Sequence, residues 1–107
     1  MKVRIGDQSL RVRISPHEAE ALERGAHLSV NLRLNVIDTF SLELHAWHLS
    51  IAELHSESNL LKLSIPREAA QQLVAERGYS FRSEQPSGNQ NPLLIEVEID
   101  LEKAKNP

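Results

Sequence analysis

Most of the chain alternates between apolar and polar residues, the pattern of β-strands that have one buried face. Residues 1–5 and 10–14 both alternate in this way, with Lys or Arg at most of the polar positions. Gly6-Asp7 between the two runs has the composition of a tight turn, so residues 1–14 are expected to form a β-hairpin. This hairpin presents an apolar face on one side and a cationic face on the other.

Further alternating runs predict strands at 28–34, 40–46, 61–65 and 95–101, with turns at 35–38 and 56–59. After Trp47 the apolar residues change phase, because Leu49 and Ile51 take odd positions. A bulge or bend near Trp47–Ser50 explains this slip. Residues 79–82 predict a short strand, and residues 85–92 have the Pro, Gly and Asn content of an exposed loop.

Two short helices interrupt the strands. Ser15-Pro16-His17-Glu18 combines a capping serine, a proline for the first turn and a glutamate that completes a capping box, so a helix is expected over 16–24. Gly25 is its expected stop. A second helix is expected to begin at Pro66 and to stop at Gly78, with Ala69, Ala70, Leu73 and Val74 on its apolar stripe.

The two helical regions resemble each other in sequence. Each begins after an apolar strand with a Pro-x-Glu-Ala segment, and each later reaches Glu-Arg-Gly. Two ββαββ halves at about 1–48 and 49–101 explain this likeness, followed by a tail at 102–107; the alternative is that helix capping favours these residues independently. The expected fold is α+β, with about eight mainly antiparallel strands in one sheet, able to curve toward a barrel, and two short helices.

Length and composition restrict the class of protein. The 107 residues suit a single domain, 1–107, and the net charge of −3 argues against a dedicated nucleic-acid binder. Absent cysteines exclude disulfides and thiolate metal sites. No apolar run has the length of a membrane span, and no signal-peptide core precedes the first strand. A soluble cytoplasmic protein that binds neither nucleic acid nor membrane is therefore expected.

Charge is distributed unevenly between the ends of the chain. The first hairpin holds four cations, and the last strand holds three acids: Lys2, Arg4, Arg11 and Arg13, and Glu96, Glu98 and Asp100. One interpretation is a solvated sheet face on which opposite charges pair. The other is a functional site, in which the cations bind a phosphate or carboxylate and the acids hold a divalent cation such as Mg²⁺ or Mn²⁺.

A second candidate site surrounds the single tryptophan. Glu43, His45 and Trp47 lie on the polar face of one predicted strand, where they are candidates for binding a partner. His45 and His48 are three residues apart, so on one strand they point to opposite faces and cannot share a metal ion without a bend. His27 has no histidine or acid at chelating spacing along the chain.

The basic hairpin, the Ser15–Glu18 helix start and the final Ile95-Glu96-Val97-Glu98 strand together resemble a family of small bacterial proteins of unknown function. That resemblance implies a bacterial protein and carries no activity. The Glu96-Val97-Glu98 strand is also distantly similar to the paired-glutamate strand of triphosphate tunnel enzymes. In those enzymes a lysine follows two residues later and the strand is N-terminal, whereas this chain has Asp100 there and places the strand last.

No P-loop, dinucleotide-binding glycine pattern, nucleophile elbow or zincin helix is present in the sequence. The favoured hypothesis is therefore a non-enzymatic binding or interaction module without a cofactor, which forms a homodimer or binds a protein partner through a sheet edge or face. The alternative is an anion-binding, metal-assisted phosphohydrolase that uses the basic hairpin and the acidic strand. Sequence alone does not decide whether the protein is an enzyme.

Overall fold

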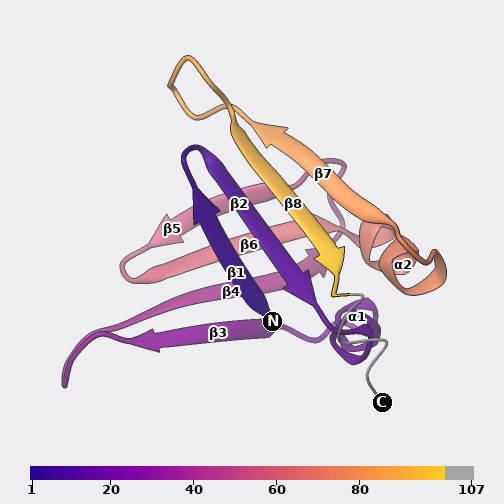
Figure 1. Ribbon diagram of the computed structural model, residues 1–107, viewed down its shortest axis with the longest axis horizontal. Coiled ribbons are helices and arrows are strands. Elements are labelled where there is room, and N and C mark those ends of the chain that lie inside the picture. The colour runs from indigo at the N-terminus through magenta and orange to yellow at the C-terminus, as the bar shows by residue number, and fades with distance from the viewer. Residues whose placement is uncertain (101–107) are drawn as a thin grey trace.

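The computed structural model describes residues 1–100, which form eight strands and two helices (Figure 1). The first half of the chain contains β1 (Lys2–Gly6), β2 (Ser9–Ile14), α1 (Pro16–Glu23), β3 (Leu28–Arg33) and β4 (Thr39–Trp47). The second half contains β5 (Glu53–Glu57), β6 (Leu60–Pro66), α2 (Arg67–Ala75), β7 (Ser80–Gln85) and β8 (Leu93–Ile99). The predicted ββαββ order is therefore present in each half, and the predicted tail at 102–107 lies outside the described residues.

The strands form two four-stranded mixed sheets, which corrects the expectation of one mainly antiparallel sheet. Sheet A has the order β1-β2-β8-β7 and sheet B the order β3-β4-β6-β5. In each sheet two antiparallel hairpins meet through a parallel pair, β2 with β8 and β4 with β6. Among residues 1–100 neither sheet closes into a barrel. The reason is topological, because each helix crosses from one sheet to the other.

The two sheets have matching registers. The pairing Lys2↔Arg13 in sheet A corresponds to Glu53↔Ser64 in sheet B when the halves are aligned at their hairpins. Likewise Leu28↔Leu44 of the β3–β4 hairpin corresponds to Phe81↔Val97 of the β7–β8 hairpin. Each sheet thus combines one hairpin from each half.

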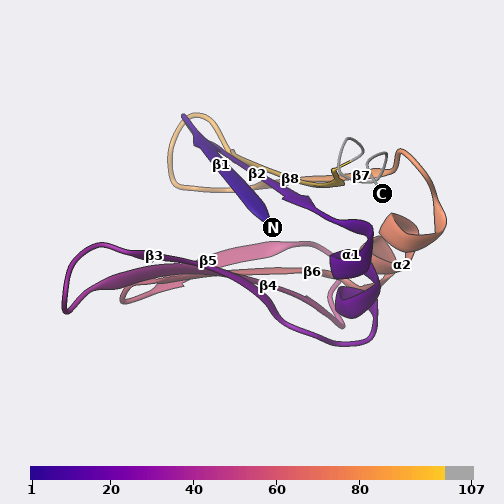
Figure 2. The same cartoon turned by 60° about the horizontal axis from the view of Figure 1, so that its bottom comes forward.

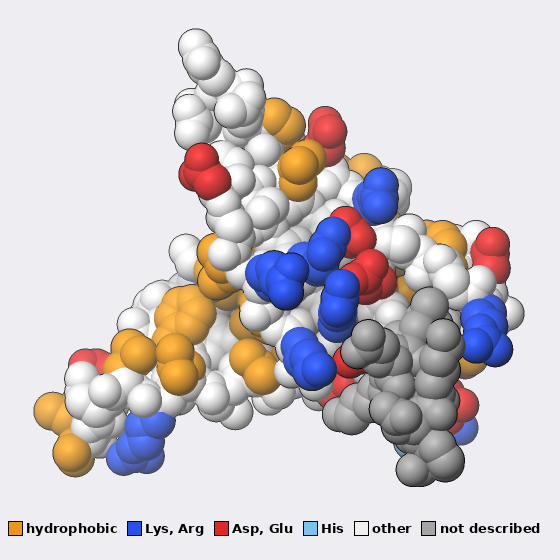
Figure 3. Space-filling model, viewed as in Figure 1, with side chains coloured by type: hydrophobic (Ala, Val, Ile, Leu, Met, Phe, Trp, Pro, Cys, Tyr) orange, Lys and Arg blue, Asp and Glu red, His pale blue; other side chains and the backbone are white. Residues whose placement is uncertain are grey.

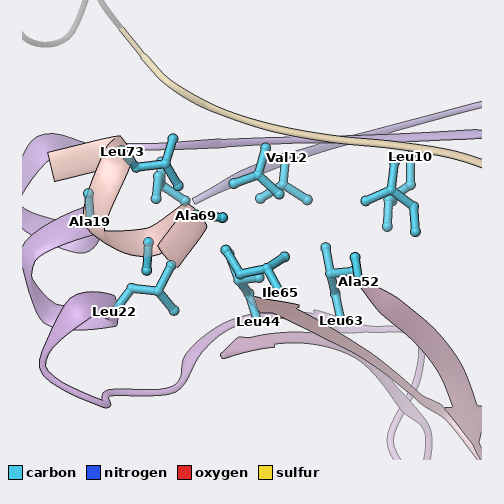
Figure 4. Packing of buried hydrophobic residues seen from close by; sticks show 14 of the residues in the cluster. Leu10, Val12, Ala19, Leu22, Leu44, Ala52, Leu63, Ile65, Ala69 and Leu73 are labelled. Atoms are coloured by element: carbon cyan, nitrogen blue, oxygen red, sulfur yellow. The ribbon is translucent and has the colours of Figure 1, made fainter. Parts of the chain in front are cut away.

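The core lies between the sheets. Figure 2 shows the two sheets as facing layers, with both helices at one end. Side chains from the inner faces meet there, including Leu10 and Val12 from sheet A and Leu44, Leu63 and Ile65 from sheet B (Figure 4). Each of these five side chains is at most 3% exposed, so their burial supplies a large part of the apolar free energy that holds the layers together.

Both helices pack against each other at the closed end of this core. The α1 start has the predicted capping box: the backbone N–H of Glu18 donates to Ser15 Oγ (3.1 Å), and the backbone N–H of Ser15 donates to Glu18 Oε1 (2.8 Å). Ala19 and Leu22 are its buried residues. Gly25 and Gly78 both adopt positive φ. α1 ends next to its predicted stop at Gly25, whereas α2 ends at Ala75, three residues before the predicted stop at Gly78.

Several predicted bounds need correction. No bulge occurs near Trp47; β4 ends there, and β5 begins at Glu53 as the first strand of the second half. The apparent slip in phase is therefore a connection between two strands. The strand expected at 79–82 extends to Gln85, and the last strand begins two residues earlier than predicted, at Leu93. Within residues 1–100 neither helix has the length or apolarity needed to span a bilayer.

Candidate functional site

The charged face is the outward side of sheet A, which carries side chains from all four of its strands. Because Leu10, Val12 and Ile14 turn inward, the intervening Arg11 and Arg13 turn outward. In Figure 3, Lys and Arg side chains gather at the centre of this view, and Asp and Glu side chains lie directly beside them. The cations of the predicted basic hairpin thus lie outside the core, on an open surface.

Parallel pairing of β2 with β8 brings the predicted cations and acids together. The register places Arg11 opposite Glu96 and Arg13 opposite Glu98. Arg13 Nε donates to Glu98 Oε1 at 2.7 Å, whereas Arg11 lies farther off, at 3.8 Å from Glu96 and 4.0 Å from Glu98. The interpretation as a ladder of opposite charges accounts for these contacts without a ligand.

The surroundings of Glu98 favour its ionised form. Partial burial by itself raises the pKa of Glu98, but hydrogen bonds with Arg13 and Glu96 and the positive charges of Arg13 and Arg11 outweigh it. The net result is a pKa of Glu98 below its ordinary value. The carboxylate is therefore ionised at neutral pH and neutralised by its neighbours.

The three acids proposed as metal ligands are occupied by cationic side chains. Glu96 forms ion pairs with Arg82 at 3.6 Å and with Arg11 at 3.8 Å, and Lys2 lies 3.4 Å from the buried carboxylate of Asp100. Among residues 1–100, these acids do not form a group with three ligand atoms close enough to share one ion. Their assignment to a metal stays a prediction.

A groove of about 680 Å³ crosses the charged face. Three of its lining residues are arginines from three different strands: Arg4, Arg11 and Arg82. Arg4 forms no ion pair with any of the described residues, and Arg82 is 76% exposed. Sequence reasoning missed Arg82, although counting back across the 86–92 loop places it opposite Glu96.

The outward face of sheet B carries a different group, here called the imidazole cluster: His27, Glu43 and His45. Their ligand atoms all lie within 4.8 Å of one another, which makes this the one set of three potential metal ligands found in residues 1–100. His27 immediately precedes β3, and the Leu28↔Leu44 register brings it across from His45. Sequence reasoning missed this neighbour because it compared histidines along one strand only.

Direct contacts hold the cluster together. His27 Nδ1 lies 2.8 Å from Glu43 Oε1, and the rings of His27 and His45 meet edge to face at a centroid distance of 4.8 Å. His45 Nε2 lies 2.6 Å from the hydroxyl of Ser64 on β6. Partial burial lowers the pKa of His45, and the charge of His27 lowers it further against the opposing effect of Glu43. His45 is thus neutral at physiological pH.

Trp47, the third member of the predicted partner-binding set, lies beside this cluster at the end of β4. Its ring stacks on His45 with a centroid distance of 6.1 Å and an interplanar angle of 19°, and 56% of the residue is exposed. His48 contacts Trp47 from the other side, at 6.2 Å. The structure therefore groups His45 with His27, and not with His48.

An exposed apolar segment forms a third surface. The β3–β4 hairpin extends beyond sheet A, and its apolar residues are 56–89% exposed: Leu32, Leu34, Val36 and Ile37. Figure 3 shows apolar side chains on this arm, at lower left. The 35–38 turn is ordered by Asn35, whose side-chain oxygen accepts from the backbone N–H of Ile37 and of Asp38 at 2.9 Å. Four apolar side chains of one hairpin are thus open to solvent.

Comparison with known proteins identifies the family but no activity. The sequence profile of a family of unknown function, DUF7009, matches residues 1–106. No curated protein and no solved structure matches the chain. Because the match spans nearly the whole sequence, the chain belongs to this family of unknown function, DUF7009.

Proposed function

We propose that the protein is a non-enzymatic interaction module that pairs with a second copy of itself through the free edge of β3. The observation that carries this proposal is the β3–β4 hairpin, where four apolar residues are exposed next to an unpaired strand edge. Antiparallel addition of a strand satisfies the free backbone groups and covers apolar side chains at once.

The chemistry of the four edge strands singles out β3. Natural edges are kept from pairing by charged side chains along them. Three of the edges follow this rule, with Lys2 and Arg4 on β1, Glu53 and Glu57 on β5, and Arg82 and Glu84 on β7. By contrast, β3 carries no charge from Leu28 to Leu32 and ends at Arg33.

A second copy suits this edge better than a charged partner does. When β3 pairs antiparallel with itself about Val30, Leu28 of one copy faces Leu32 of the other, so apolar side chains meet apolar side chains. The neutral strand also avoids the like-charge contacts that self-pairing would create on the other three edges. The apolar, uncharged edge of β3 is therefore complementary to the same edge of a second copy.

The second half of the chain supports the view that this apolar surface is not required by the fold. We infer that the halves arose by duplication of a ββαββ unit, supported by their matching registers. At the positions equivalent to Leu32 and Leu34, the second half has Gln85 and Ser87. The same topology thus forms with polar residues there, so the apolar residues serve another purpose.

The test is the mass of the protein in solution. Sedimentation or light scattering should give twice the chain mass of 12.1 kDa, in a concentration-dependent equilibrium. Leu32→Lys should shift the equilibrium to monomer, because it places a charge on the pairing edge. Ile51→Lys is the matched control, since Ile51 is 65% exposed against 59% for Leu32 but lies in the β4–β5 connection and not on the β3 edge. A monomer at every concentration, or a dimer unaffected by Leu32→Lys, would contradict the proposal.

A second candidate function is the binding of a phosphate-containing anion in the groove of the charged face. Its supporting observation is the meeting of Arg4, Arg11 and Arg82 there, with Arg4 unpaired among residues 1–100. Guanidinium groups from separate strands suit the several oxygens of a phosphate. Because Glu96, Glu98 and Asp100 are engaged by cations, this proposal assigns binding to the groove, without hydrolysis or a metal.

Thermal unfolding with and without pyrophosphate tests this second function. A ligand at a hundred times its dissociation constant adds about 2.7 kcal/mol, which raises the midpoint by roughly 10 °C in a chain of this size. Arg4→Ala and Arg82→Ala should abolish the rise, whereas Arg67→Ala on α2 should not. A rise that needs Mg²⁺ would favour the phosphohydrolase alternative, and no rise at low salt would exclude pyrophosphate binding.

A further inference from the structure

We propose that the imidazole cluster of His27, Glu43 and His45 is a binding site for a divalent transition metal, with Zn²⁺ as its best-matched ion. The site lies on the outward face of sheet B and is independent of the proposed β3 edge pairing. It rests on the geometry of three side chains, two on β4 and one immediately before β3, joined by direct contacts.

The donor set determines the class of metal. Two imidazole nitrogens and one carboxylate oxygen are ligands that Zn²⁺, Ni²⁺ and Co²⁺ accept, whereas Mg²⁺ and Ca²⁺ prefer oxygen ligands alone. Ligand atoms within 4.8 Å of one another need only small side-chain rotations to surround one ion, because zinc–ligand bonds are about 2.0–2.2 Å long. Three protein ligands leave a coordination position for water.

Backbone register makes the cluster rigid enough for this role. Glu43 and His45 are two residues apart on β4 and therefore share a face. His27 is fixed opposite His45 by the antiparallel pairing that begins at Leu28. Ser64 on the next strand contacts His45, which holds the ring in place as an outer-shell partner does at metal sites.

The equivalent positions of sheet A have the same backbone pairing but carry no histidine. Ser80, Glu96 and Glu98 occupy the places of His27, Glu43 and His45, and there the acids are neutralised by arginines. On sheet B, Lys62 lies opposite Glu43 in register but no ion pair between them is found in the described part of the chain. Glu43 instead contacts His27, so its charge remains close to the two imidazoles.

Two further side chains near the imidazole cluster, Lys62 and His55, affect the protonation of His45. Lys62 and His55, on the neighbouring strands, add positive charge near His45 and disfavour its protonated form. The same positive charges also oppose a bound dication, so the proposal rests on the geometry and donor set of the three ligands. The same two groups lie outside the set of three ligands and therefore offer control positions on the same face.

Trp47 provides a built-in reporter, because it is the only tryptophan and stacks on His45. We would titrate untagged protein with Co²⁺ and follow both Trp47 fluorescence and visible absorption. We expect saturable quenching at one equivalent of Co²⁺ with absorption bands of a bound ion. Zn²⁺ should displace Co²⁺ and restore the fluorescence.

Single variants locate the ligands. His27→Gln, Glu43→Gln and His45→Gln should each weaken Co²⁺ binding at least tenfold, with unchanged circular dichroism, since all three side chains lie on the outward face. His55→Gln and His48→Gln should leave the affinity within twofold. The assignment is overturned if no saturable binding occurs, if any of the three ligand variants keeps wild-type affinity, or if His48→Gln abolishes binding.

Discussion

Gln85 ties the two sheets together at a point where their backbones are not hydrogen-bonded to each other. It ends β7 of sheet A, and its side chain reaches Leu54 on the free edge of β5 in sheet B. There Gln85 Oε1 accepts from the backbone N–H of Leu54 at 2.7 Å, and Gln85 Nε2 donates to the Leu54 carbonyl at 2.8 Å. One side chain thus satisfies both backbone groups of an edge residue, as a neighbouring strand would.

Replacing this side chain should have a measurable cost. A buried or partly buried hydrogen bond contributes about 0.5–1.5 kcal/mol net, so Gln85→Ala should reduce the free energy of unfolding by about 1–3 kcal/mol. In a domain of about 100 residues this lowers the melting midpoint by about 5–20 °C. Gln85→Glu retains the acceptor for the Leu54 N–H but loses the donor, so its loss should be at least half as large.

Urea unfolding at neutral pH provides the assay, with amide hydrogen exchange at Leu54 as the local readout. The exchange should accelerate in Gln85→Ala, because the N–H loses its acceptor. Glu84→Ala is the control, since Glu84 is adjacent, exposed and directed outward. If Gln85→Ala and Glu84→Ala agree within about 0.5 kcal/mol, the typical range for surface substitutions, the side chain does not hold the sheets together.

Three further variants test other parts of the structure by urea unfolding. Ser15→Ala removes the α1 cap and should cost about 1 kcal/mol; an unchanged midpoint would show that the cap contributes nothing. Leu44→Ala in the core should cost about 2–5 kcal/mol, whereas Leu94→Ala, at a half-exposed position, should cost less than 1 kcal/mol, and equal losses would contradict the assigned core. Because the folded pKa of Glu98 is lowered, its stabilisation is present above the ordinary carboxyl pKa of about 4.3 and disappears as pH falls through the folded value. The stability difference between wild type and Glu98→Gln should therefore shrink from pH 7 toward about pH 3, and a difference that grows on acidification would reverse the assigned sign.

Local features of the fold were predictable from the sequence because local physics determines them. The capping box at Ser15 and Glu18 lies within four residues, and α1 ends just before Gly25. The pairing of β2 with β8 was not predictable in the same way, because it joins segments more than 80 residues apart. Alternation alone also does not distinguish one curved sheet from two sheets that face each other, since both bury one side of every strand.

In the candidate sites, too, the features set by local sequence were predictable and those set by strand pairing were not. Outward placement of Arg11 and Arg13 followed from alternation, but their acidic neighbours depend on the parallel register of β2 and β8. The imidazole cluster was not predictable from the expected turn, because a hairpin centred on residues 35–38 pairs His27 with Ala46. The observed register is centred on Val36, one step away, and places His27 across from His45. The exposure of Val36 and Ile37 was not predictable either, since a sequence does not reveal how far a hairpin extends beyond its covering sheet.

Comparison of the two halves separates what the fold requires from what this chain adds. Equivalent positions that remain apolar in both halves form the core, as Leu10 and Leu61, Val12 and Leu63, and Ile14 and Ile65 do. Positions where the halves differ in chemistry include several in the candidate sites: His27 against Ser80, His45 against Glu98, and Leu32 against Gln85. One topology accepts both members of each pair, so burial and pairing alone do not demand the histidines or the exposed leucine. Their presence on sheet B therefore points to binding, and it directs the first experiments to that sheet.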